Sequence, residues 1–119
     1  MQIEFTGKTV IVTGAAHGMG RAIAVAFAER GATVWGCDLL PDELAETQRL
    51  CQAAGAVCAV RTVDVRDIAA IQRFTDEVGG ADILISNAGG VLGYVGKPMD
   101  QVTPTEWNDI IAVNLSAAF

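Results

Sequence analysis

The segment from Lys8 to Arg30 constrains the fold of this chain more than any other. Lys8–Val12 is an apolar, β-branched run typical of a buried strand, and Met19–Arg30 carries apolar residues at helical spacing. Between them lies the glycine-rich sequence Thr13-Gly14-Ala15-Ala16-His17-Gly18-Met19-Gly20. A strand, a glycine turn and a helix in this order bring unpaired backbone N–H groups and the positive end of a helix dipole together. The segment therefore predicts a turn at which a diphosphate can bind without a side-chain charge.

Apolar runs and helical stripes alternate along the rest of the chain. The pattern predicts strands at Lys8–Val12, Thr33–Cys37, Val57–Val63 and Ile83–Ile85, helices at Met19–Arg30, Pro41–Ala54 and Asp67–Val78, a glycine-rich loop from Asn87 to Met99, and a last helix that begins with the capping box Thr103-Pro104-Thr105-Glu106. Repeated β-α-β units with short links imply parallel strands joined by right-handed crossovers. We expect residues 1–119 to form one α/β domain, a doubly wound parallel sheet of the Rossmann type.

Composition excludes several classes of function. The net charge is −6 with no basic cluster, which argues against a nucleic-acid partner. The longest apolar run, Ala22–Ala28, is too short to span a membrane, and the first residues do not resemble a secretory signal. The three cysteines lack C-x-x-C spacing, and the chain contains a single histidine. This pattern indicates free thiols, no metal site and a reducing, cytoplasmic location.

Ligands of a doubly wound sheet bind beyond the carboxyl ends of its strands. Applied to the predicted strands, this rule selects Gly14–Gly20, Asp38, Asp64 and Asn87–Gly89 without reference to any family. We expect these four groups to lie at one edge of the sheet.

Asp38 follows the second predicted strand, twenty residues after Gly18. A carboxylate there can accept hydrogen bonds from ribose hydroxyls and would repel a 2′-phosphate. A hydrogen bond to a charged group contributes about 1.5–3 kcal/mol, which corresponds to roughly ten- to a hundredfold preference for NAD over NADP. Leu39 and Leu40 offer a 2′-phosphate no cation, and His17 is the candidate cation nearby. Aspartate also begins turns and caps helices, but beside the glycine turn ribose binding is favoured.

Four motifs occur in order along the chain. The glycine turn has the form T-G-x-x-x-G-x-G, and the common fingerprint G-x-G-x-x-G fails because Ile23 occupies its third glycine position. Asp64-Val65, Asn87-Ala88-Gly89 and Asn114 in a V-N-L-S setting follow. In this order and spacing the chain resembles the short-chain dehydrogenase/reductase family over Thr13–Asn114.

The resemblance implies cofactor-binding roles for the first motifs. The contact residues of the glycine turn would be Thr13, Gly14, His17, Gly18, Met19 and Gly20. Asp64 and Val65 would border the adenine, although Asp64 has the alternative role of capping the turn into the next helix.

The resemblance also assigns roles to the asparagine motifs. Asn87, Ala88 and Gly89 would lie beside the cofactor's ribose, with Ser86 in place of the family's first asparagine; by composition an ordinary Asx turn fits equally well. Asn114 would be catalytic, holding a water in a proton relay, whereas composition alone favours a satisfied polar side chain.

The family transfers a hydride between a nicotinamide cofactor, here NAD, and a small-molecule alcohol or carbonyl substrate, and many members form tetramers. Its catalytic pair has the form Y-x-x-x-K, which sets both side chains on one helix face. Tyr94 has Lys97 three positions later among glycines and a proline, so we reject this pair as catalytic. The resemblance implies that the chain is the amino-terminal, cofactor-binding part of a longer single-domain enzyme and is inactive alone. It also implies that Ile83–Ile85 lacks its next strand and forms an apolar edge.

Two other classes of function stay open. A non-catalytic dinucleotide-binding module is consistent with the missing Tyr-Lys pair. A methyltransferase also combines a glycine loop with an acidic residue after the second strand, but Thr13-Gly14 with its three-residue gap fits that loop poorly.

Overall fold

Four parallel strands form one sheet in the order β3-β2-β1-β4 in the computed structural model, which describes residues 2–119. The strands are β1 (Thr9–Thr13), β2 (Thr33–Asp38), β3 (Cys58–Thr62) and β4 (Ile83–Ile85). In the central register, Val10 pairs with Val34 on one side and with Ile83 on the other. The expected Rossmann-like topology is confirmed. Strand β3 is one residue shorter at each end than predicted, although the Val57 carbonyl still accepts from the Val34 N–H and the Val63 N–H donates to the Asp38 carbonyl.

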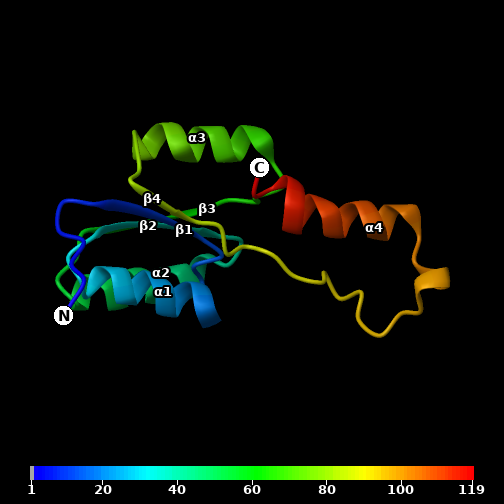
Figure 1. Cartoon of the computed structure of the whole chain (residues 1–119), viewed down its shortest axis with the longest axis horizontal. Helices are drawn as coiled ribbons and strands as arrows, with labels where there is room; N and C mark the ends of the chain where they lie inside the picture. The colour runs from blue at the N-terminus through cyan, green and yellow to red at the C-terminus, as the bar shows by residue number, and fades with distance from the viewer. Residues whose placement is uncertain (1) are drawn as a thin grey trace.

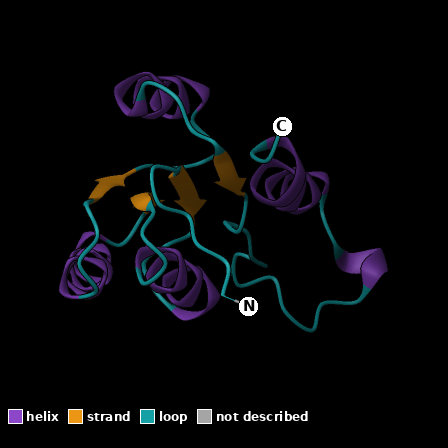
Figure 2. Cartoon of the chain, turned by 60° about the vertical axis from the view of Figure 1, so that its left-hand side comes forward, coloured by secondary structure: helices purple, strands orange, loops and turns teal. Residues whose placement is uncertain are grey.

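Helices cover both faces of the sheet (Figure 1). Helices α1 (Gly18–Ala28) and α2 (Pro41–Ala53) lie on one face, and α3 (Ile68–Val78) and α4 (Pro104–Ile111) lie toward the other. Figure 2 shows the same layers from the side, with the loop after β4 extending away from the sheet before it reaches the 3-10 turn η1 (Met99–Gln101) and α4. The predicted capping box is present: the Thr103 hydroxyl accepts from the Glu106 N–H and the Glu106 carboxylate accepts from the Thr103 N–H.

The core alternates along β1 as a strand period requires. Val10 and Val12 are fully buried against α1 and α2, and Ile11 packs on the other face with Cys37 of β2 and Phe74 of α3. Within residues 2–119, Thr47 of α2 is the one buried polar side chain.

Strand β4 pairs with β1 alone in the described part of the chain. Its central residue Leu84 is 59% exposed, so an apolar side chain lies uncovered at the sheet edge. Among residues 2–119, the structure contains no helix with the length and apolarity to cross a bilayer.

Candidate functional site

A cavity of about 280 Å³ lies at the carboxyl edge of the sheet. Residues that follow all four strands line it, namely Gly14, His17, Met19 and Gly20 after β1, Asp38 and Leu39 after β2, Val63, Asp64, Val65 and Arg66 after β3, and Asn87, Ala88, Gly89 and Leu92 after β4, together with Val113. The structure therefore brings together the four groups that the strand-end rule selects, because parallel strands end at the same edge.

Two positions of the loop after β1 require glycine for different local reasons. A Cβ on Gly20 would collide with the Gly14 carbonyl oxygen, so the first turn of α1 can approach the loop only with glycine there. Gly18 has φ +55° and nothing within 4 Å of the position where its Cβ would lie. Gly20 is thus required by packing and Gly18 by its left-handed backbone conformation, and Gly18 is not among the residues that line the cavity.

The N-terminus of α1 carries no side-chain cap. His17 is its N-cap residue, makes no capping hydrogen bond, and no acidic residue occupies the first turn. Each of the other α-helices among residues 2–119 has a capping side chain or an acidic first turn. The first i→i−4 bond of α1 runs from the Arg21 N–H to the His17 carbonyl, so the N–H groups before Arg21 have no intrahelical acceptor. Such an end attracts an anion.

Asp38 joins the end of β2 to the glycine loop. Its Oδ2 accepts from the Ala16 N–H at 3.1 Å, and its Oδ1 accepts from the Leu39 N–H at 2.6 Å. A carboxylate has about four lone-pair directions, so two remain for hydroxyl donors in the cavity. Asp38 thus has the turn-forming role typical of aspartate, and the same carboxylate lies on the cavity wall.

Asp64 is held by Arg66 within its own turn. The Arg66 N–H and Nε donate to Oδ1 at 2.9 and 3.1 Å, and Nη2 donates to Oδ2 at 2.9 Å. The Arg66 side chain lowers the pKa of Asp64, which stays ionised. Asp64 thus has the alternative role of capping the turn into α3, because its side chain accepts from the Arg66 N–H and its carbonyl accepts from the Asp67 N–H. The N-cap of the helix itself is Asp67, whose carboxylate accepts from the Ala70 N–H.

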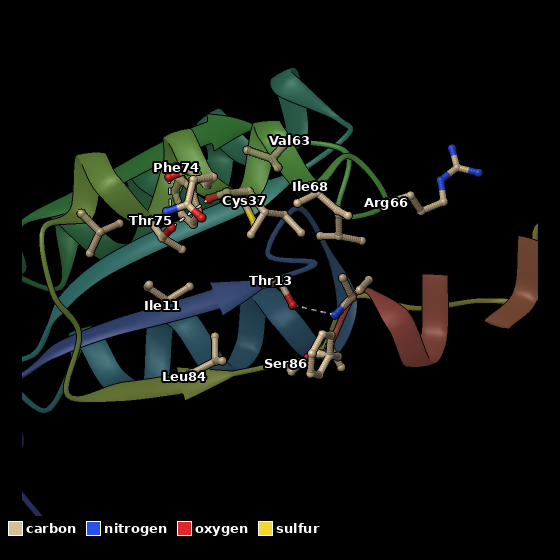
Figure 3. A pocket seen from close by; sticks show the side chains of 18 of the residues that line it. Ile11, Thr13, Cys37, Val63, Arg66, Ile68, Phe74, Thr75, Leu84 and Ser86 are labelled. Atoms are coloured by element: carbon tan, nitrogen blue, oxygen red, sulfur yellow. Dashed lines mark hydrogen bonds between the residues drawn. The ribbon is translucent and has the colours of Figure 1, made fainter. Parts of the chain in front are cut away.

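Thr13 and Asn87 tie the ends of β1 and β4 together. The Thr13 hydroxyl accepts from the N–H groups of Asn87 and Ala88 at 3.1 and 3.0 Å. The Asn87 amide donates to the Thr13 and Gly14 carbonyls at 3.2 Å each. Thr13 lies behind the 280 Å³ cavity, which it does not line, and Figure 3 shows its hydroxyl bonded between the strand ends.

Asn114 lies in a π-helical turn, Ala112–Ser116, that continues α4. Its amide donates to the Gly90 and Ile110 carbonyls at 2.7 and 3.0 Å, and its Oδ1 accepts from the Gly90 N–H at 3.0 Å. A Cβ on Gly89 would come within 2.6 Å of Oδ1. Asn114 thus fixes the segment after Asn87 from behind, since Val113 and Gly89, but not Asn114, line the cavity.

Comparison with known proteins identifies the family. A profile described as short chain dehydrogenase matches residues 8–119. The chain belongs to the short-chain dehydrogenase family. Its relative 3-oxoacyl-acyl-carrier-protein reductase FabG of Vibrio harveyi is 38% identical over 118 residues, covering 98% of this chain and 47% of the relative. The chain spans slightly less than half the length of this relative and of several other curated relatives.

Solved structures of the family share this fold. Carveol dehydrogenase of Mycobacterium avium, in complex with NAD, superposes with a TM-score of 0.82 at 30% identity over 94% of this chain and 46% of its own. A metagenomic short-chain oxidoreductase, in complex with NADP, superposes with a TM-score of 0.87 at 35% identity over 94% of this chain and 52% of its own.

Tyr94 and Lys97 of this short-chain dehydrogenase chain contact different residues of α4. The Tyr94 hydroxyl donates to Asp109 at 3.1 Å, and the Lys97 ammonium donates to both Glu106 oxygens at 2.7 and 2.8 Å. The Asp109 carboxylate raises the pKa of Tyr94, the opposite of what a general base requires. These contacts fasten the loop after β4 to α4.

A second cavity of about 680 Å³ lies between α3 and the end of α4 (Figure 3). It is larger but mainly apolar, with Ile11, Phe74 and Leu84 on its walls. Burial and the nearby Asp38 raise the pKa of Cys37, the thiol on this wall, to about 12, so the thiol stays protonated and unreactive. No uncapped helix end or free carboxylate of the described residues faces this space, and the smaller cavity remains the candidate site.

Sequence reasoning missed part of the wall of the smaller cavity. Five further residues line it, namely Leu39, Val63, Arg66, Leu92 and Val113. The sequence does contain a signal for Arg66, since this residue follows Asp64 by two positions at the end of a predicted strand. Leu92 and Val113 had none, because only the path of the long loop and α4 brings them to the site.

Proposed function

We propose that this chain is the NAD-binding portion of an oxidoreductase that transfers a hydride between a nicotinamide cofactor and a small alcohol or carbonyl substrate. The observation that carries this proposal is the sharing of one cavity by the uncapped N-terminus of α1 and the carboxylate of Asp38. One group suits a diphosphate and the other suits a ribose, so together they suit a dinucleotide.

The residues present fit such a cofactor. The amides at the start of α1 and the open space beside Gly18 would hold the pyrophosphate, and the free lone pairs of Asp38 would accept from the adenosine ribose. Asp64 and Val65 would border the adenine, and Asn87–Gly89 would lie beside the second ribose. A bound nicotinamide supplies the hydride acceptor or donor. The chain's own residues would bind and orient it.

The preference for NAD over NADP rests on charge. In NADP the 2′-phosphate would bring a negative charge next to the carboxylate of Asp38, which would repel it. Of the two basic side chains on the cavity wall, Arg66 and His17, the arginine is already paired with Asp64. Because family structures occur with NAD and with NADP, it is this local charge that favours NAD.

Asn114 is our candidate for the proton relay of the reaction. Its amide already orders the Gly90 segment, and it lies in a π-helical turn, a feature frequent at functional sites. The tyrosine and lysine that such a relay would serve have no counterpart in residues 1–119, so we expect the isolated 119-residue polypeptide to bind cofactor without turnover.

The proposal is tested by titrating the intact gene product with NADH, NADPH and S-adenosylmethionine, following NADH fluorescence and calorimetry. We expect NADH to bind at least tenfold more tightly than NADPH, and S-adenosylmethionine not to bind. Binding of S-adenosylmethionine alone would support the methyltransferase alternative. NADH binding without turnover of any alcohol or carbonyl by the intact product would favour the non-catalytic module.

A further inference from the structure

We propose that Thr47 and Arg21 are positioning residues of the dinucleotide site, which they act on from behind the glycine loop. They hold the Ala15 and Ala16 carbonyl groups toward α2 and thereby set which peptide N–H groups face the cavity. This inference rests on the proposed function.

Thr47 makes the first of the two side-chain contacts with the glycine loop. Its side chain is 1% exposed, and its hydroxyl donates to the Ala15 carbonyl at 2.8 Å, with the Ala16 and Glu43 carbonyls each 3.3 Å away. A threonine hydroxyl in a helix ordinarily bonds only to its own preceding turn. Here the bond crosses to a loop 32 residues earlier in the chain.

Arg21 makes the second contact from α1. Its Nη2 donates to the Ala16 carbonyl at 2.6 Å and to the Glu43 carbonyl at 2.9 Å, and its Nε donates to the Thr47 hydroxyl at 3.0 Å. The guanidinium thus completes the hydrogen bonds of the buried hydroxyl and binds the same loop. Its acceptors here are two carbonyls and a hydroxyl, and the Glu46 carboxylate of α2 interacts with it through space without a hydrogen bond.

Four successive carbonyl groups of the loop are therefore held by side chains of other elements. Asn87 binds those of Thr13 and Gly14 from the β4 side, and Thr47 with Arg21 binds the next two from the α2 side. None of these oxygens is then free to turn toward a bound phosphate, which it would repel.

Peptide planarity carries the effect to the site. In a trans peptide the N–H points opposite to the carbonyl that precedes it. The Ala15 carbonyl points to Thr47, and the Ala16 N–H accordingly donates to Asp38 at 3.1 Å. In the same way, the bonded Ala16 carbonyl turns the His17 N–H away from α2. Thr47 and Arg21 therefore orient both an anchor of Asp38 and the first amide of the proposed phosphate site.

The test compares ligands with and without the pyrophosphate. In the intact gene product, Thr47→Val removes the hydroxyl at nearly constant volume, and Thr47→Ser retains it. The control Thr75→Val makes the same change on α3, where the hydroxyl bonds only to Ile71 and Gln72 of its own helix. We expect Thr47→Val to weaken ADP-ribose binding about tenfold, the worth of one hydrogen bond. Adenosine binding should weaken less than twofold, because Asp38 keeps its second anchor, the Leu39 N–H. Thr47→Ser and Thr75→Val should bind ADP-ribose like the wild type.

Arg21→Met, which keeps the apolar stem, provides a second variant where Thr47→Val does not fold, and the same selective loss of ADP-ribose binding is expected. Wild-type affinity for ADP-ribose in folded Thr47→Val or Arg21→Met would overturn the inference. Equal weakening of ADP-ribose and adenosine would also overturn it, because that result marks general loosening of the fold. Absence of ADP-ribose binding by the wild type would instead contradict the proposed function.

Discussion

Gly18 and Gly20 lie two residues apart in the loop and lack a side chain for different reasons. We expect Gly20→Ala to lower stability by about 1–3 kcal/mol or more, because its methyl group would collide with the Gly14 carbonyl. Gly18→Ala should cost only about 1–2 kcal/mol for its left-handed φ, yet abolish dinucleotide binding by filling the open space. Thermal melts and NADH titration of both variants separate the two effects.

Gly55→Ala is the matched control, since its φ is +92° and nothing lies within 4 Å of its Cβ position, at the far end of α2. It should show a stability loss like that of Gly18→Ala with unchanged NADH affinity. If Gly18→Ala also keeps wild-type affinity, the phosphate does not bind beside Gly18.

Asp38 is the residue on which cofactor preference depends. We expect Asp38→Ala with Leu39→Arg to shift the ratio of NADPH to NADH affinity by about ten- to a hundredfold toward NADPH, because one charged acceptor is lost and a cation is gained. Competitive titration of both cofactors measures the ratio. Leu39→Arg alone is the control and should shift it less, because Asp38 remains bonded to the loop. An unchanged ratio in the double variant would remove Asp38 from the ribose site.

At the scale of the element, the start of α4 depends on one carboxylate. Glu106 accepts from the Thr103 N–H and from Lys97, and these partners, Lys97 first, lower its pKa below the ordinary value of 4.5. A lowered folded-state pKa means that the contribution of Glu106 to stability is complete above pH 4.5 and is lost as the pH falls through the folded-state pKa. We expect Glu106→Gln to have a lower melting temperature than the wild type near pH 7. The difference between the two melting temperatures should become smaller as the pH falls.

Melting temperatures measured from pH 7 to pH 2.5 test this prediction. Glu4→Gln removes the same charge at an exposed position before β1 and should run parallel to the wild type. A constant difference between Glu106→Gln and wild type across this range would show that the carboxylate does not contribute to the start of α4.

At the scale of the whole molecule, the uncovered side of the sheet governs association. The 119-residue polypeptide presents an unpaired edge at β4, with Leu84 59% exposed beside an apolar cavity of about 680 Å³. Exposed apolar edges pair with other chains. We expect this polypeptide to self-associate with increasing concentration, and Leu84→Glu to shift it toward monomer. Sedimentation at several concentrations measures the distribution, and a wild-type polypeptide that stays monomeric throughout would contradict the prediction.

Much of the fold follows from local pattern. Val10, Ile11 and Val12 alternate between two cores as the period-2 pattern requires, and the Thr103–Glu106 box begins α4 where the sequence predicts it. The convergence of Asp38 and Asp64 on one cavity follows from parallel strand order alone. The boundary of β3 was missed because ladder bonds, not composition, decide where a strand ends.

The sequence by itself determined the order of the elements, the parallel sheet and the edge at which its ligand-binding residues gather, because periodicity and crossover handedness act over short stretches of chain. Only the tertiary structure decided which side chains complete that edge. The contact of Thr47 with Ala15, the pairing of Asn114 with Gly90 and the π-helical turn around Asn114 join positions far apart in the chain or depend on how α4 meets the loop. These contacts are set by how helices pack against the loops, and no local pattern of residues encodes that packing.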